Sequence, residues 1–96
     1  MNIKYNAALL QNLESIFREG GYTVRFERGN FQNGYCVLEK RKVVVINKFH
    51  ELEAKINSLM EILLSIKDLD IENLSNESMQ LFQQIRTENP VTLFEK

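Results

Sequence analysis

Apolar residues recur every three or four positions in the first part of the chain, which is the spacing of one face of an α-helix. Leu9, Leu13 and Ile16 show this spacing, and polar residues fill most positions between them. Gly20-Gly21 follows, and a residue without a Cβ favours the backbone conformation that closes a helix. The pattern predicts an amphipathic helix over about residues 3–19.

The period changes to two after the glycine pair, as it does in a half-buried strand. Two further segments are rich in β-branched and aromatic residues, and the second of them is apolar without alternation. That pattern suits a strand covered on both faces, so we place this segment centrally in the sheet. The loops between the segments predict chain reversals and an antiparallel meander. The expected strands cover about residues 22–28, 35–39 and 43–47.

Helical spacing returns in the second half and predicts helices over about residues 50–67 and 76–88. The first of these is apolar around most of its circumference, so it is either the central helix of the core or a surface that meets a second subunit. Ser75 is a favourable N-cap for the second, and Asn89-Pro90 ends it. The predicted fold is a single α+β domain over residues 1–96: an N-terminal helix, a three-stranded antiparallel meander, a long apolar helix and a C-terminal helix. We expect both later helices on one face of the sheet.

Composition narrows the class of protein. The chain has 96 residues, 44% of them hydrophobic, and a formal net charge of -1, which excludes a disordered chain. No apolar run approaches the ~20 residues that span a bilayer, and the first residues contain no apolar signal segment. We therefore expect a cytoplasmic protein without a membrane segment. One cysteine cannot form an internal disulfide.

Charge is divided unevenly along the chain. Residues 1–48 carry eight basic and four acidic side chains, a net charge of +4, whereas residues 49–96 carry four basic and nine acidic ones, a net charge of −5. Halves of opposite charge favour contact between copies. Together with the apolar helix and the apolar residues 91–94, this predicts a non-enzymatic protein that forms a homodimer or binds a protein partner. The candidate interface residues are Leu59, Ile62, Leu63, Ile66, Leu93 and Phe94.

The loop after the first strand is a second candidate contact region. Glycines flank residues 30–33, three of which carry amide side chains. No phosphate-binding glycine pattern is present, so the loop predicts a partner or ligand contact and not a nucleotide site. The candidate residues are Arg28, Asn30, Phe31, Gln32, Asn33 and Tyr35.

Catalytic and metal chemistry has few available groups. Cys36 and His50 are the only thiol and imidazole, so a nucleophile with a histidine base would need this pair. Their spacing matches no known signature, and a lone strand cysteine is more often a small buried residue. We expect no enzyme, no metal and no cofactor. Paired acids such as Asp68 and Asp70 are interpreted as solvated charges.

Nucleic-acid binding through a basic hairpin is the main alternative. Lys40, Arg41 and Lys42 form a basic cluster that Lys48, Arg25 and Arg28 would extend beside aromatic residues. The sequence pI near 5.8 weighs against this hypothesis, because phosphate binding normally needs a wide positive field.

Three stretches resemble a family of small uncharacterised bacterial proteins: RGNFQNGYCVL at residues 28–38, VVVINK at 43–48 and LEAKI at 52–56. The resemblance covers roughly residues 20–90 and implies no activity. The order of elements is also faintly similar to the core of minimal zinc metallopeptidases, whose helix carries His-Glu-x-x-His. The matching residues here are MEILL at 60–64, so Glu61 is kept and both histidines are absent. This second resemblance implies a related fold without zinc or peptidase activity.

Overall fold

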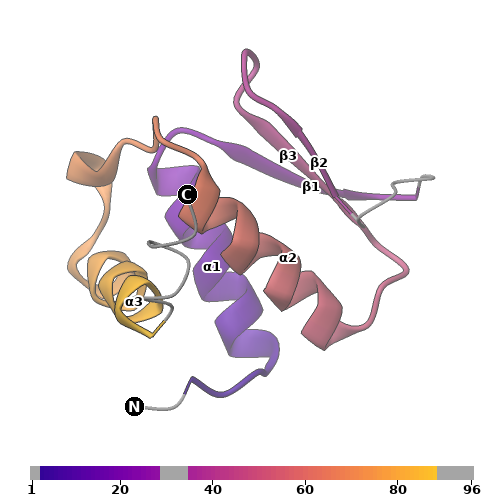
Figure 1. The fold of residues 1–96 in the computed structure, drawn as a ribbon, viewed down its shortest axis with the longest axis horizontal. Helices are drawn as coiled ribbons and strands as arrows, with labels where there is room; N and C mark the ends of the chain where they lie inside the picture. The colour runs from indigo at the N-terminus through magenta and orange to yellow at the C-terminus, as the bar shows by residue number, and fades with distance from the viewer. Residues whose placement is uncertain (1–2, 29–34, 89–96) are drawn as a thin grey trace.

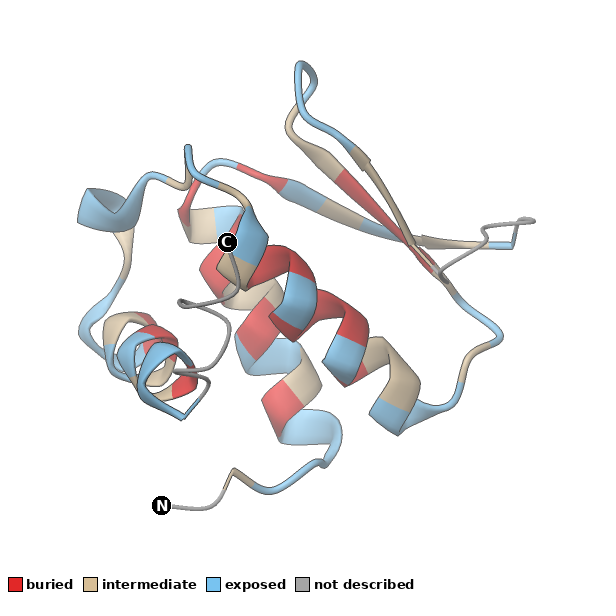
Figure 2. Ribbon diagram, in the orientation of Figure 1, coloured by how far each residue is buried: buried red, intermediate tan, exposed pale blue. Residues whose placement is uncertain are grey.

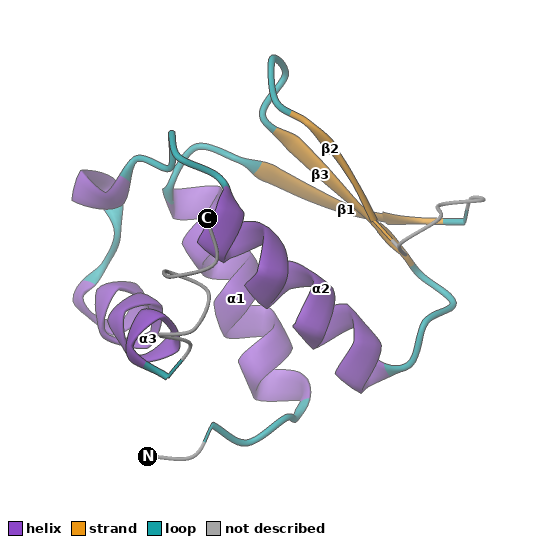
Figure 3. Cartoon of the chain, in the orientation of Figure 1, coloured by secondary structure: helices purple, strands orange, loops and turns teal. Residues whose placement is uncertain are grey.

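The computed structural model describes residues 3–28 and 35–88. This part of the chain contains three helices, one short 3-10 helix and one three-stranded sheet (Figures 1 and 3), so the predicted α+β class is confirmed. In chain order, the elements are α1 (Ala7–Glu19), β1 (Thr23–Glu27), β2 (Tyr35–Leu38), β3 (Val43–Asn47), α2 (Leu52–Ser65), η1 (Ile71–Asn73) and α3 (Asn76–Thr87).

The sheet is mixed, and the predicted antiparallel meander is wrong. The strand order is β1-β3-β2, with β1 parallel to β3 and β2 antiparallel to it. The apolar strand β3 takes the centre, as its sequence indicates, because Val44, Val45 and Ile46 are buried there. The seven residues between β1 and β2 are enough to cross one strand, since an extended residue spans ~3.3 Å and strands lie ~4.8 Å apart.

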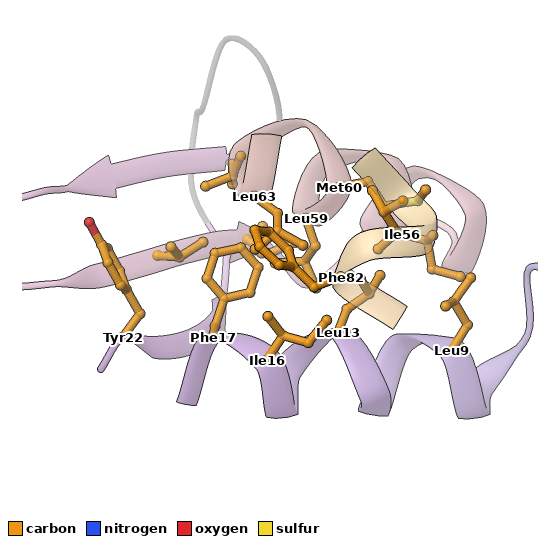
Figure 4. Close-up of a cluster of buried hydrophobic side chains, with 14 residues drawn as sticks. Leu9, Leu13, Ile16, Phe17, Tyr22, Ile56, Leu59, Met60, Leu63 and Phe82 are labelled. Atoms are coloured by element: carbon orange, nitrogen blue, oxygen red, sulfur yellow. The ribbon is translucent and has the colours of Figure 1, made fainter. Parts of the chain in front are cut away.

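Two helices cover one face of the sheet (Figure 1): α1 packs against β1, and α2 packs against β3 and α1. The helix α3 packs against α1, so α1 and not α3 is the second helix of this layer. The helix predicted over residues 50–67 corresponds to α2, which is shorter than predicted at both ends. The buried side chains of α2 belong to the core. Figure 2 marks the buried residues in red along the ribbon, and Figure 4 shows a cluster of buried hydrophobic side chains. They include Leu13, Phe17, Ile46, Leu59, Ile62 and Ile85.

Side-chain and backbone caps explain where the outer helices begin and end. The Asn6 side chain accepts a hydrogen bond from the Leu9 amide at 2.8 Å, and the Ser75 hydroxyl accepts one from the Ser78 amide at 3.1 Å. After α1, Gly21 adopts φ 98°, a left-handed conformation that other residues rarely take. The predicted cap at Ser75 and the predicted helix end at the glycine pair are both confirmed.

Polar contacts fasten the segment between α2 and α3 to the end of α1 and the sheet. The Tyr22 hydroxyl donates to Asp68 Oδ1 at 2.6 Å, and Lys42 Nζ contacts Asp68 Oδ2 at 2.7 Å. Burial and the hydrogen bond to Asp68 raise the pKa of Tyr22 to about 12. The hydrogen bonds from Lys42 and Tyr22 hold the pKa of Asp68 below its ordinary value. The Asp70 amide also donates to the Gly20 carbonyl at 3.0 Å.

Candidate interaction surface

One face of the sheet is not covered by any helix of the described residues (Figure 1). Val24, Phe26, Tyr35, Val37, Val44 and Ile46 pack against the core between the sheet and the helices. Side chains alternate along a strand, so their neighbours point to the opposite side. We call this opposite side the open face. Its residues are Thr23, Arg25, Glu27, Cys36, Leu38, Val43, Val45 and Asn47.

The open face has an apolar half. Cys36 pairs with Val45 and Leu38 pairs with Val43, so four small or apolar side chains lie together on β2 and β3. Leu38 is 42% exposed, which places it among the most exposed large apolar side chains of the described residues. Val45 is only 9% exposed, yet it lies outside the main core cluster.

The two edges of the sheet differ in charge. On β1, Arg25 and Glu27 form an ion pair on the open face. On β2, the four residues Tyr35–Leu38 include no charged side chain, and among the described residues β2 pairs only with β3. Charged residues on an edge strand discourage pairing with another chain, so the edge of β2 is the less protected one. We call this edge, together with Cys36, Leu38, Val43 and Val45, the β2 surface.

The part of the predicted interface that falls on α2 is internal. Leu59, Ile62 and Leu63 are buried in the core of the chain, and Ile66 is half-buried just after α2. Core packing therefore accounts for the apolar character of α2 without a second subunit. Leu93 and Phe94 lie outside the described residues.

Most of the predicted contact loop also lies outside the described residues, namely Asn30, Phe31, Gln32 and Asn33. Its two flanking residues are described. Tyr35 begins β2 on the core side of the sheet, and burial raises its pKa, with a smaller effect from the charge of Glu61. The Arg28 guanidinium lies 5.5 Å from the centroid of the Phe49 ring.

Most basic residues of the predicted cluster divide between opposite ends of the sheet. Lys40, Arg41 and Lys42 lie in the turn between β2 and β3, and Lys42 is already held by Asp68. At the other end, Arg28 and Lys48 both approach the ring of Phe49, which is 65% exposed. Arg25 lies between these ends on β1, where it forms an ion pair with Glu27. The six basic residues of the predicted cluster are thus spread along the sheet.

The thiol and the imidazole occupy different settings. Cys36 lies on the open face of β2, whereas His50 lies in the turn between β3 and α2, where its amide donates to the Asn47 carbonyl at 3.2 Å. No hydrogen bond joins the two side chains, and His50 Nδ1 is buried without a partner in the described structure. Within residues 3–28 and 35–88, no group of three histidine, cysteine or acidic side chains is placed to hold a metal ion.

In comparisons with known proteins, no protein-family model, curated protein or solved structure matches the chain. No helix in the described part of the chain is long and apolar enough to cross a membrane. On α2, Glu61 is exposed, and the two positions where a metallopeptidase would carry histidines are Met60, which is buried, and Leu64, which is half-buried.

Sequence reasoning missed the β2 surface, although the sequence contains a signal for it. The four apolar residues Val43–Ile46 indicated a strand covered on both faces. In the described structure, helices cover only the face that carries Val44 and Ile46. The apolar residues of the other face, Val43 and Val45, are the part of this pattern that the fold leaves without a helix.

Proposed function

We propose that this protein is a non-enzymatic binding module that self-associates through its β2 surface. The single observation that carries the proposal is the uncharged edge strand β2, which in the described part of the chain pairs only with β3 and presents apolar side chains on a face that no described helix covers. On this strand, Leu38 exposes 42% of its surface. Covering these side chains would remove apolar area from water, at roughly 25 cal/mol for each Å².

A second copy of the chain is the partner that fits this surface. The charged side chains on the open face are one arginine and one glutamate, which already neutralise each other as an ion pair. Two identical faces can therefore meet without a net like-charge repulsion, which would otherwise oppose symmetric association. The β2 half of the face is uncharged, so it can be desolvated without leaving an unpaired charge.

The non-enzymatic part of the proposal rests on the placement of the reactive groups. The only thiol and the only imidazole have no hydrogen bond between them, since His50 Nδ1 has no partner in the described structure and Cys36 lies on β2, opposite Val45. A nucleophile with a histidine base needs the two within hydrogen-bond reach. The β2 surface is instead uncharged and apolar, as surfaces that contact another protein often are.

Replacing Leu38 with glutamate tests the proposal. Leu38→Glu places a charge in the proposed contact, and we expect its dimer dissociation constant to rise by about tenfold or more, since 1.4 kcal/mol corresponds to a factor of ten. Leu52→Glu is the matched control, because Leu52 is 37% exposed but begins α2, away from the open face. The measurement is the mass of both variants and the wild type by light scattering at several concentrations.

Thermal unfolding of both variants at the wild-type midpoint, at a concentration where the chain is monomeric, would show that neither substitution disrupts the monomer. A wild type that stays monomeric, or a Leu38→Glu variant that dimerises as well as Leu52→Glu, would contradict the proposal.

A further inference from the structure

The β2 surface can meet its copy in two ways, either by stacking the open faces or by pairing the edges of β2. We infer that the edges pair: two copies join β2 to β2 in antiparallel orientation about a two-fold axis, forming one six-stranded sheet centred on Val37. This inference rests on the proposed self-association and names its geometry.

Size argues against stacking of the open faces alone. Three strands of at most five residues cover a footprint of about 14 by 17 Å, from the usual spacings of ~4.8 Å between strands and ~3.3 Å along them. This footprint is small beside the ~800 Å² that each partner usually contributes to a stable interface. Pairing of two β2 edges also buries little area, but it adds main-chain hydrogen bonds, which are the source of affinity in strand addition and which stacking of the faces would not supply.

The chemistry of the edges selects β2. An unpaired edge strand exposes backbone donors and acceptors that a second chain can satisfy, and charged side chains normally block this. The β1 edge carries Arg25 and Glu27, whereas Tyr35–Leu38 is uncharged and has no strand on its outer side in the described structure. The edge of β2 therefore lacks the protection that the edge of β1 has.

The two-fold symmetry fixes which residues face each other. With the axis perpendicular to the sheet, the open faces of both copies lie on the same side, so a residue can pair only with one of the same orientation. Centring on Val37 pairs Val37 with itself and Cys36 with Leu38 of the partner subunit, while Tyr35 faces a position just beyond the end of the partner's β2. Each exposed Leu38 then packs against a thiol across the new strand pair, which explains why a large apolar side chain stands at this edge.

A disulfide introduced across the axis tests this register. Leu38→Cys places a new thiol opposite the partner subunit's Cys36, and paired residues of antiparallel strands have Cα atoms about 4.5–5.5 Å apart, within the range that a disulfide spans. With oxidised glutathione as the acceptor of the two electrons, we expect Leu38→Cys to form a covalent dimer about tenfold or more faster than the wild type, because pairing raises the effective concentration of the thiols.

Two controls separate the register from random collisions. Cys36→Ser in the Leu38→Cys background removes the opposite thiol and should return cross-linking to the slow rate. Leu52→Cys, at a similarly exposed leucine on α2, should also stay slow. A fast reaction in either control would overturn the inference.

Hydrogen exchange of the wild type supplies a readout that needs no substitution. Pairing predicts that the β2 amides exchange more slowly as the concentration rises through the dimer transition, while the β1 amides do not change. A dimeric wild type whose β2 amides are unaffected, or whose own Cys36 cross-links rapidly, would overturn edge pairing centred on Val37 and leave the proposed self-association intact. A monomeric wild type would overturn both.

Discussion

The side chain of Asp68 connects three segments of the chain. The sequence suggested a solvated charge, but its carboxylate accepts from the Tyr22 hydroxyl and pairs with Lys42. These contacts join residues 46 and 26 positions apart, a separation at which sequence periodicity carries no information. Short-range features at the same scale, such as the Ser75 cap and the glycine pair, were predictable because their chemistry is local.

The acidic groups at this junction predict a dependence of stability on pH. The hydrogen bonds to Asp68 from Lys42 and Tyr22 lower its pKa from 3.8, and the hydrogen bond from the Ser75 amide lowers the pKa of Glu19 from 4.5. A carboxylate whose folded pKa lies below its unfolded pKa binds fewer protons in the folded state. Its stabilising contribution is therefore fully present above the unfolded value and is lost as the pH falls through the folded value.

We expect Asp68→Asn to flatten this dependence. The variant should have a lower free energy of unfolding at neutral pH than the wild type, and should lose less of it between about pH 5 and pH 2. Urea denaturation at a series of pH values measures both quantities. Asp70→Asn is the matched control, because in the described structure the Asp70 carboxylate accepts a hydrogen bond from the nearby Asn73 side chain and does not join distant segments. Equal pH profiles for wild type and Asp68→Asn would contradict the role of this carboxylate.

At the scale of elements, the sequence predicted the type and order of the α-helices and strands of the described residues, but not the short helix η1 or the pairing of the strands. The period of each segment depends on which of its faces is buried, and this is a local property. The partner of a strand depends on the path of the connecting chain. The apolar run of β3 did indicate its central place, and a meander would have put β2 there instead, so the sequence already contained the evidence against the meander.

The sequence of α2 allowed two interpretations, a core helix or an interface. Its burial supports the core helix, and a stability measurement tests this. Leu59 is fully buried, so Leu59→Ala should lower the free energy of unfolding by about 2–5 kcal/mol, as cavity-forming substitutions do. Leu52→Ala, at the exposed start of the same helix, should cost less than about 1 kcal/mol. Chemical denaturation at a protein concentration where the chain is monomeric checks this. Similar losses for both variants would contradict the placement of α2 in the core.

At the scale of the whole molecule, the described structure is a two-layer domain with helices on one side of a small sheet (Figure 1). Small domains bury a modest share of their surface, so association of exposed sheet surface adds to their stability. The candidate site was less predictable than the fold. The apolar pattern identified residues that are withdrawn from water, but not whether a helix of the same chain covers each of them.

The most direct test of self-association is the mass of the wild-type chain in solution, measured by light scattering over a wide range of protein concentration. Self-association through β2 predicts a concentration-dependent rise from the 11.3 kDa of one chain to twice that mass, with no larger species, because pairing of the two β2 edges closes the assembly. A mass that stays at 11.3 kDa at every concentration would contradict it.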